Sequence, residues 1–165
     1  MKQFNYDLLE NRKKELIQDN SGPRVYHTPD GTFPSITNLL YEMVSKKGIE
    51  EWKEKVGKEQ AQKISTKASR RGTRIHGYIE KYMAGNENYL DKAPPDHMEL
   101  VNLAIPQINE KIDNIRGIEL GMWSEGLRVA GTSDLIADYE GELAVIDWKT
   151  ATYIKKEEYL RSYIL

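Results

Sequence analysis

Apolar and polar residues alternate most regularly in the last third of the chain. Residues 118–123, 127–139 and 142–149 each show the period-two pattern of a half-buried β-strand. Glu140-Gly141 separates the last two runs, and its glycine accepts the positive φ that a two-residue hairpin turn requires. Glu125-Gly126 reverses the chain after the first run in the same way. The pattern therefore predicts a three-stranded antiparallel meander.

Helical spacing dominates the remainder of the chain. The longest helical pattern runs from about Lys58 to Met83, where small or apolar residues recur three and four positions apart. Further helices are expected over residues 6–18, 35–48, 49–56, 98–115 and 155–165, and a short strand over 24–27 that enters a turn at 28–31. These elements predict the α/β class (α+β in some schemes), with a small mixed sheet that contains the antiparallel meander and has helices on both faces.

The turn at Glu140-Gly141 also predicts the register of the last hairpin. If Tyr139 faces Glu142, then Asp134 lies directly opposite Asp147, with Cβ atoms roughly 5 Å apart. The period of two places Lys149 on the same face as Asp147. Two carboxylates this close repel each other unless a cation lies between them or one keeps its proton. A bound divalent metal ion is the simpler interpretation.

The preceding hairpin predicts a third carboxylate near this pair. A two-residue turn at Glu125-Gly126 would place Glu119 beside Thr132 and diagonal to Asp134. This placement depends on the length of the turn, because a one-residue shift moves every side chain of a strand to the opposite face.

Composition excludes several classes of site. The 165-residue chain has no cysteine, so disulfides, thiolate catalysis, cysteine-ligated zinc and iron–sulfur clusters are all excluded. Its net charge of −2 does not indicate a strongly basic nucleic-acid-binding domain. No apolar run approaches the ~20 residues that a membrane span needs, and the N-terminus lacks the pattern of a signal peptide. We therefore expect a cytoplasmic protein that does not associate with membranes.

Asp134, Asp147 and Lys149 form a set suited to hydrolysing phosphodiesters with a divalent metal ion. Carboxylates hold hard cations, which polarise a phosphate and lower the pKa of a bound water, while a lysine can orient that water or offset the charge that develops on phosphorus. The alternative is a surface charge pair, since Glu51-Trp-Lys53 has the same spacing in a helical segment without a hairpin partner.

The long helix contributes further candidates. His76 and Glu80 are one turn apart and share a face, and Gly72 lies one turn before His76. Arg70, Arg71 and Arg74 can grip a nucleic-acid backbone, because the arginine fork matches the geometry of phosphate. The alternatives are a packed or solvated histidine and a solvated basic helix face.

Several motifs together resemble a known family. They are Arg71-Gly-Thr-Arg-Ile-His76 with Ile79-Glu80, Ile118-Glu119, Ala130-Gly-Thr-Ser-Asp134 and Val145-Ile-Asp-Trp-Lys-Thr150. In this order and spacing the motifs resemble the RecB-like nucleases of the PD-(D/E)xK superfamily, within the exonuclease group that includes phage and mitochondrial genome maintenance enzymes. The resemblance covers roughly residues 24 to 165 and implies a restriction-endonuclease-like core.

The resemblance also implies roles for individual residues. His76, Asp134, Asp147 and Lys149 would form the active site, and the metal ligands would be His76, Asp134, Asp147 and the backbone carbonyl of Trp148. Glu80 and Glu119 match acidic positions near that site. The cofactor would be Mg²⁺ or Mn²⁺, and a histidine ligand suits Mn²⁺ at least as well as Mg²⁺.

The implied function is metal-dependent exonucleolytic cleavage of DNA that has a free end or is single-stranded, in recombination, repair or degradation. A recombination or replication protein would be a partner, and a phage-encoded enzyme would act in the host cytoplasm. The whole chain would be one domain, with residues 1–57 as an N-terminal elaboration and 58–165 as the nuclease core.

Two departures from the family keep alternatives open. The cysteine-ligated iron–sulfur cluster of several relatives is excluded here, and the chain stops at Leu165, where a Gln-x-x-x-Tyr motif would be expected. The core is therefore interpreted as truncated at its C-terminus. A non-catalytic DNA-binding module and a restriction-like endonuclease are the competing hypotheses.

Overall fold

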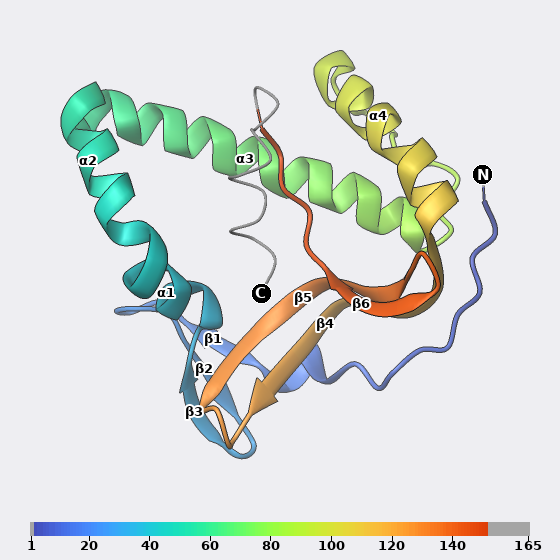
Figure 1. The fold of residues 1–165 in the computed structure, drawn as a ribbon, viewed down its shortest axis with the longest axis horizontal. Coiled ribbons are helices and arrows are strands. Elements are labelled where there is room, and N and C mark those ends of the chain that lie inside the picture. Colours follow the sequence, from blue (N-terminus) through green and yellow to red (C-terminus); the bar gives the residue numbers. More distant parts are fainter. Residues whose placement is uncertain (1, 152–165) are drawn as a thin grey trace.

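The computed structural model describes residues 2–151, which form two three-stranded antiparallel sheets with helices beside them (Figure 1). The strands are β1 (Ile17–Asp19), β2 (Val25–Thr28) and β3 (Gly31–Pro34) in the first sheet, and β4 (Ile112–Ser124), β5 (Val129–Tyr139) and β6 (Glu142–Ile146) in the second. The helical elements are the 3₁₀-helix η1 (Arg12–Glu15), α1 (Ile36–Leu40), the π-helix η2 (Tyr41–Ser45), α2 (Lys46–Val56), α3 (Lys58–Met83) and α4 (Pro95–Lys111). The α+β class and the antiparallel meander are confirmed. Parallel pairing is confined, in the described residues, to the isolated bridges Tyr6–Ile115 and Ser35–Ala130.

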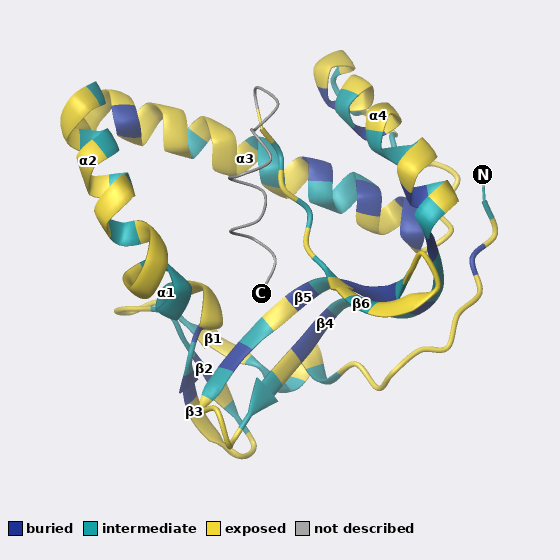
Figure 2. Cartoon of the chain, in the orientation of Figure 1, coloured by how far each residue is buried: buried dark blue, intermediate teal, exposed yellow. Residues whose placement is uncertain are grey.

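Helix α3 has the bounds that its periodicity predicted. Its C-terminal half forms the core, with Ile75, Ile79, Tyr82 and Met83 buried, whereas Ala61 is the one buried residue of its first half (Figure 2). The predicted apolar stripe therefore faces the core over only part of its length. The first half of α3 is solvated on most sides, which leaves its basic side chains accessible.

The register predicted for the last hairpin is confirmed. Tyr139 pairs with Glu142, and the ladder continues in step to Leu135 and Ile146. Glu140 and Gly141 both have positive φ, of 52° and 89°. Positive φ at both central residues is the requirement of a type I′ turn, whose twist matches that of the flanking strands. A local turn signal was therefore sufficient to align β5 with β6.

The register predicted for the preceding hairpin is wrong by two residues. Ser124 pairs with Val129, so the connection has four residues and includes Arg128 at φ 53°. Thr132 consequently lies opposite Gly121 rather than Glu119. Glu119 itself has φ 50°, and the ladder pairs its neighbours on both sides without pairing Glu119.

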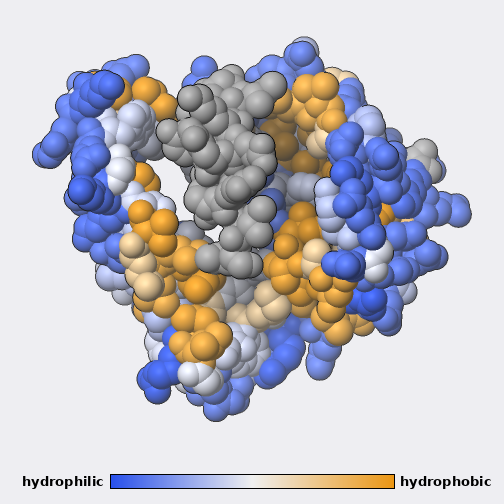
Figure 3. All heavy atoms as spheres, viewed as in Figure 1, coloured by the Kyte–Doolittle hydropathy of each residue, from blue (hydrophilic) through white to orange (hydrophobic). Residues whose placement is uncertain are grey.

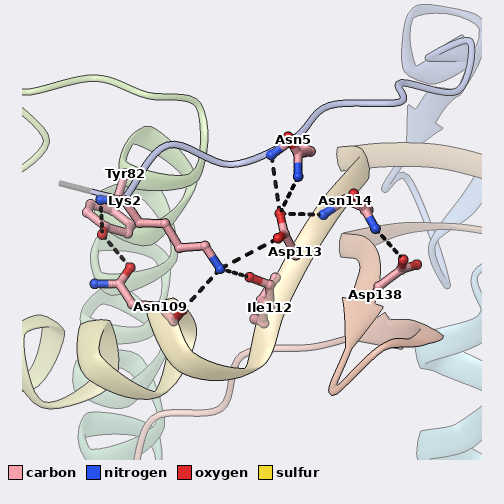
Figure 4. Close-up of polar contacts among 8 residues, drawn as sticks. All are labelled: Lys2, Asn5, Tyr82, Asn109, Ile112, Asp113, Asn114 and Asp138. Atoms are coloured by element: carbon pink, nitrogen blue, oxygen red, sulfur yellow. Dashed lines mark hydrogen bonds and ion pairs between the residues drawn. The ribbon is translucent and has the colours of Figure 1, made fainter.

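The N-terminal segment is extended up to Asn11, which contradicts the helix expected over residues 6–18 except at the 3₁₀-helix η1 (Arg12–Glu15). It runs beside β4, where the Ile115 N–H donates to the Asn5 carbonyl at 2.7 Å and the Asp7 N–H donates to the Ile115 carbonyl at 2.9 Å. Figure 4 shows Lys2 donating to the carbonyls of Asn109 and Ile112. The edge of β4 needs backbone partners, and this segment supplies them.

Two further boundaries differ from the predictions. Gly48 lies inside α2, and the chain turns instead at Gly57, whose φ is 90°. Helix α4 ends at Lys111, so the residues up to Ile115 belong to β4 and not to a helix. The helix predicted for residues 155–165 lies outside the described residues.

Two apolar clusters organise the packing. The larger joins α3 and α4 to Leu135 and Ala137 of β5, and the smaller packs Tyr26 and Phe33 of the first sheet against Ala130. Leu143 and Val145 of β6 are 67% and 71% exposed. Apolar side chains gather over the α1–η2 region and near β5 and β6 in Figure 3. Among the described residues, α3 and α4 therefore cover one face of the second sheet.

No helix within residues 2–151 has the length and apolar character needed to cross a membrane.

We expect Gly121→Ala to destabilise the fold by about 1–3 kcal/mol, because it overpacks the contact between β4 and η1. A Cβ at residue 121 would lie 2.5 Å from the Cα of Lys13 and 2.9 Å from its nitrogen, so backbone has to move. Gly126→Ala is the matched control, since the nearest atom to its Cβ would be Ser124 Oγ at 4.0 Å. Urea denaturation measures both. Equal stability of the two variants would contradict the close approach.

Candidate active site

The packing of α3 against the second sheet brings His76 to Asp134. The Nδ1 atom of His76 lies 3.2 Å from the Oδ2 atom of Asp134, and both side chains are mostly buried. The hydrogen bond with Asp134 raises the pKa of His76, against the effect of burial. Burial raises the pKa of Asp134, but the hydrogen bonds from His76 and from the Trp148 backbone outweigh burial and leave that pKa lowered. The contact thus favours an ionised carboxylate beside a protonated imidazole.

Trp148 also helps to fix the position of Asp134. Its backbone N–H donates to Asp134 Oδ2 at 2.8 Å, and its ring packs against the larger apolar cluster. The regular ladder ends one residue earlier than Asp147, at Ile146. A side-chain hydrogen bond therefore continues the association of the two strands beyond their backbone pairing. The role of the Trp148 carbonyl as a metal ligand stays a prediction.

Asp147 and Lys149 form an ion pair with each other at the end of β6. Their side chains are 56% and 59% exposed, whereas that of Asp134 is 15% exposed. The charge of Asp147 raises the pKa of His76, and the charge of Lys149 lowers the pKa of Asp134, although neither is the main cause. The four residues expected to form the site therefore lie within reach of one another's electrostatic fields.

The donor chemistry of this group fits Mg²⁺ or Mn²⁺. Carboxylate oxygens suit both ions, and an imidazole nitrogen suits transition metals such as Mn²⁺. Within residues 2–151, no three histidine or acidic side chains are placed closely enough to hold an ion as they stand. His76 is engaged with Asp134, and Asp147 with Lys149. A shared ion requires the exposed Asp147 side chain to rotate toward the buried pair.

The two additional acidic candidates do not take part in the contact between His76 and Asp134. The carboxylate of Glu119 pairs with Lys13 Nζ at 2.6 Å, an ion pair between residues 106 positions apart. Glu80 is exposed on α3, one turn beyond His76. The third carboxylate expected near Asp134 is thus neutralised by η1 instead. Nothing in the local sequence around Lys13 indicated this contact.

The three arginines point away from His76. An α-helix turns by about 100° per residue, so Arg70 and Arg74 lie about 120° and 160° from His76 around the α3 axis. Gly72 faces the other side, where an added Cβ would lie 3.7 Å from Thr150 Oγ1. Gly72 therefore makes an ordinary van der Waals contact with the segment after Lys149. Thr150 directly follows the Asp-Trp-Lys motif, and this position could have indicated from the sequence that Thr150 lies near the site.

The arginines line a groove between α3 and the start of α4. The groove has a volume of about 540 Å³. Its lining residues are Gln62, Lys63, Thr66, Lys67, Arg70, Arg71, Arg74, Asp96 and His97. His97 was not among the candidates from the sequence, and only its place after the helix-starting Pro94-Pro95-Asp96 could have suggested it.

Comparison with known proteins finds distant relatives. No protein-family model matches the chain. Mitochondrial genome maintenance exonuclease 1 of Homo sapiens is 24% identical over 149 residues, which is 86% of this chain and 43% of that protein. The proteins of the same name from Mus musculus and Xenopus tropicalis are 24% and 23% identical, over 80% and 93% of this chain and 41% and 45% of their own lengths. The chain spans under half the length of these curated relatives, and it is similar, at a distance, to proteins named as exonucleases.

Proposed function

We propose that this chain is a metal-dependent deoxyribonuclease of the PD-(D/E)xK type that cleaves DNA from an end. The contact between His76 and Asp134 carries the proposal, because it joins two residues 58 positions apart in the sequence. The Trp148 N–H holds that carboxylate beside Asp147 and Lys149. The similarity to proteins named as exonucleases supports cleavage from an end.

In this proposal Asp134, Asp147, His76 and the Trp148 carbonyl hold Mg²⁺ or Mn²⁺. When bound, the ion polarises the phosphate and lowers the pKa of a coordinated water. Asp134 is suited to its role because its pKa is lowered, so it stays ionised near neutral pH. Trp148 keeps this carboxylate oriented through its backbone N–H and its anchored ring.

Lys149 provides the mobile cation of the proposed site. Its exposed ammonium group pairs with Asp147 in the structure. Rotation of Asp147 toward Asp134 frees the ammonium group to donate to the attacking water or to a non-bridging phosphate oxygen. A positive charge there stabilises the charge that develops on the pentavalent phosphorus.

A DNA-binding module without catalysis is the second candidate. The observation that favours it is the pairing of the four site residues with one another, which leaves no ready-made cluster of three ligands in residues 2–151. This candidate predicts salt-sensitive DNA binding without hydrolysis.

The deciding experiment incubates the purified chain with end-labelled single-stranded and double-stranded DNA and with closed circular DNA. We expect Mg²⁺ or Mn²⁺ to support release of nucleotides from the linear substrates, and EDTA to abolish it. Asp147→Ala should slow cleavage about a hundredfold or more, since it removes a proposed ligand.

Three results would change the conclusion. Binding without cleavage favours the non-catalytic module. Cutting of closed circles indicates an endonuclease. Cleavage that Asp147→Ala retains in full would show that the assigned site is not the one that acts.

A further inference from the structure

A groove with a basic lining lies on a face of α3 that is turned away from His76. Four basic residues of α3, namely Lys67, Arg70, Arg71 and Arg74, line the α3–α4 groove without an ion-pair partner within residues 2–151. Lys63 is also present but pairs with Glu59 at 2.7 Å. Asp96, from α4, is the one carboxylate among the described residues of the lining. In a chain of net charge −2, this is a local concentration of positive charge that residues 2–151 do not neutralise by ion pairing.

The opposite wall of the groove is the start of α4. This 17-residue helix begins after Pro94 and has no side-chain cap, so its first turn presents the positive end of the helix dipole, which the Asp96 carboxylate in that turn offsets in part. The N–H groups of His97 and Met98 both donate to the Pro94 carbonyl, each at 3.0 Å. A helix start of this kind favours an anion, although by itself it does not identify a site.

His97 supplies an independent indication of a ligand. It is only 6% exposed and lines the groove, yet its Nδ1 atom has no hydrogen-bond partner in the described structure. Its ring packs near Tyr78, with 6.1 Å between centroids, which holds the ring in place. Arg71 Nε is likewise buried without a described partner. Buried polar atoms without partners are rare in folded proteins, and a bound ion or ligand is one way to complete their hydrogen bonding.

The spacing of the basic residues suits a chain of phosphates. Lys63 and Arg74 are separated by about 17 Å along α3, at about 1.5 Å per residue. One strand of B-form DNA advances about 3.4 Å per nucleotide, so the groove can follow several phosphates. Arginine is also the side chain that best matches phosphate geometry.

We infer that the groove between α3 and α4 binds phosphate groups of a DNA strand, at a site separate from the cleavage centre on the other face of α3. The choice of DNA as the source of phosphate rests on the proposed function. The groove would hold the strand by backbone contacts, and so without sequence preference.

The test measures equilibrium binding of a fluorescent oligonucleotide in EDTA, so that no cleavage is needed. We expect Arg70→Gln/Arg74→Gln to weaken binding about tenfold or more. The slope of log affinity against log salt should fall in magnitude by about 1.5, as for the loss of two phosphate contacts. Lys14→Gln/Lys47→Gln removes the same charge from exposed positions on η1 and α2 and should leave both quantities nearly unchanged. Equal effects of the two double variants, or no effect of either, would overturn the inference.

His97→Phe separates a binding role from a structural one. Phenylalanine keeps an aromatic ring against Tyr78 and removes both nitrogens. We expect DNA binding to weaken several-fold while the melting temperature stays the same or rises, because a buried nitrogen without a partner is lost. Wild-type affinity in this variant would overturn the assignment of His97 to the site.

Comparing two oligonucleotides identifies which phosphate is bound. If the arginine changes weaken binding of 5′-phosphorylated and 5′-hydroxyl oligonucleotides equally, the groove holds internal phosphates. If they weaken binding of the phosphorylated form alone, the groove holds the 5′ end of the strand. Groove-dependent binding without any cleavage by the wild type would overturn the nuclease proposal and leave the groove standing. If the wild type cleaves DNA but the groove variants bind DNA as tightly as the wild type, the groove inference is overturned and the nuclease proposal stands.

Discussion

Asp134→Asn is expected to slow DNA cleavage at least about a hundredfold, because it removes the charge around which the proposed site is arranged. The amide has nearly the same shape and its oxygen can still accept the Trp148 N–H, so the strand end should keep its position. What is lost is the anion that faces His76 at 3.2 Å. Single-turnover cleavage of end-labelled DNA in Mg²⁺ or Mn²⁺ measures the effect.

Asp138→Asn is a matched control from the same strand. The Asp138 side chain is 14% exposed, close to the 15% of Asp134, but its partners are Arg116 at 3.1 Å and Asn114 at 2.7 Å. This change should lower thermal stability and leave the rate of cleavage per folded molecule unchanged. An equal loss of activity in both variants would mean that Asp134 acts through the fold and not through chemistry.

A titration of His76 gives a readout that does not depend on activity. The hydrogen bond with Asp134 is the main cause that raises the pKa of His76. In Asp134→Asn the pKa of His76 should therefore fall toward its ordinary value, as followed by NMR of the imidazole protons. An unchanged pKa would contradict the contact itself.

Tyr82→Ala is expected to reduce the free energy of unfolding by about 3–5 kcal/mol, the usual range for deleting a buried aromatic side chain. Tyr82 is 2% exposed, and its ring packs edge-on against Phe4 and Tyr89, at 6.0 and 4.9 Å between centroids. Its hydroxyl donates to Asn109 Oδ1 at 2.6 Å (Figure 4). One side chain thus joins α3, α4 and the N-terminal segment. Urea denaturation measures the loss.

Tyr82→Phe isolates the hydroxyl from the ring. It keeps the aromatic packing and should cost about 1 kcal/mol, the net value of one hydrogen bond. If phenylalanine proves as destabilising as alanine, the hydroxyl network and not apolar burial holds these segments together. A loss below about 1 kcal/mol for alanine would show that the site is not part of the core.

The sequence by itself determined the features that depend on neighbouring residues. The bounds of α3 follow from apolar residues at helical spacing, and the β5–β6 register follows from Glu140-Gly141. That register placed Asp134 next to the end of β6, where it meets the Trp148 N–H. Turn geometry and periodicity operate over a few residues, so they can be interpreted without knowledge of the fold.

Predictions from local sequence were wrong where a long-range contact stabilised a different arrangement. Residues 6–18 have helical spacing, but the segment bonds instead to the open edge of β4, near Ile115. Glu119 was placed by an assumed two-residue turn, whereas the real connection has four residues and the carboxylate pairs with Lys13. Backbone edges and buried charges must find partners, and distant segments supplied them here.

Only the tertiary structure decided how the candidate residues combine. The packing of α3 on the second sheet brings His76 to Asp134 on one face of the helix and turns Arg70 and Arg74 to another. The approach of α4 then closes the groove with His97, a residue that no motif had marked. Burial of apolar surface between elements sets these angles, and that energy depends on the whole fold and not on any one stretch of sequence.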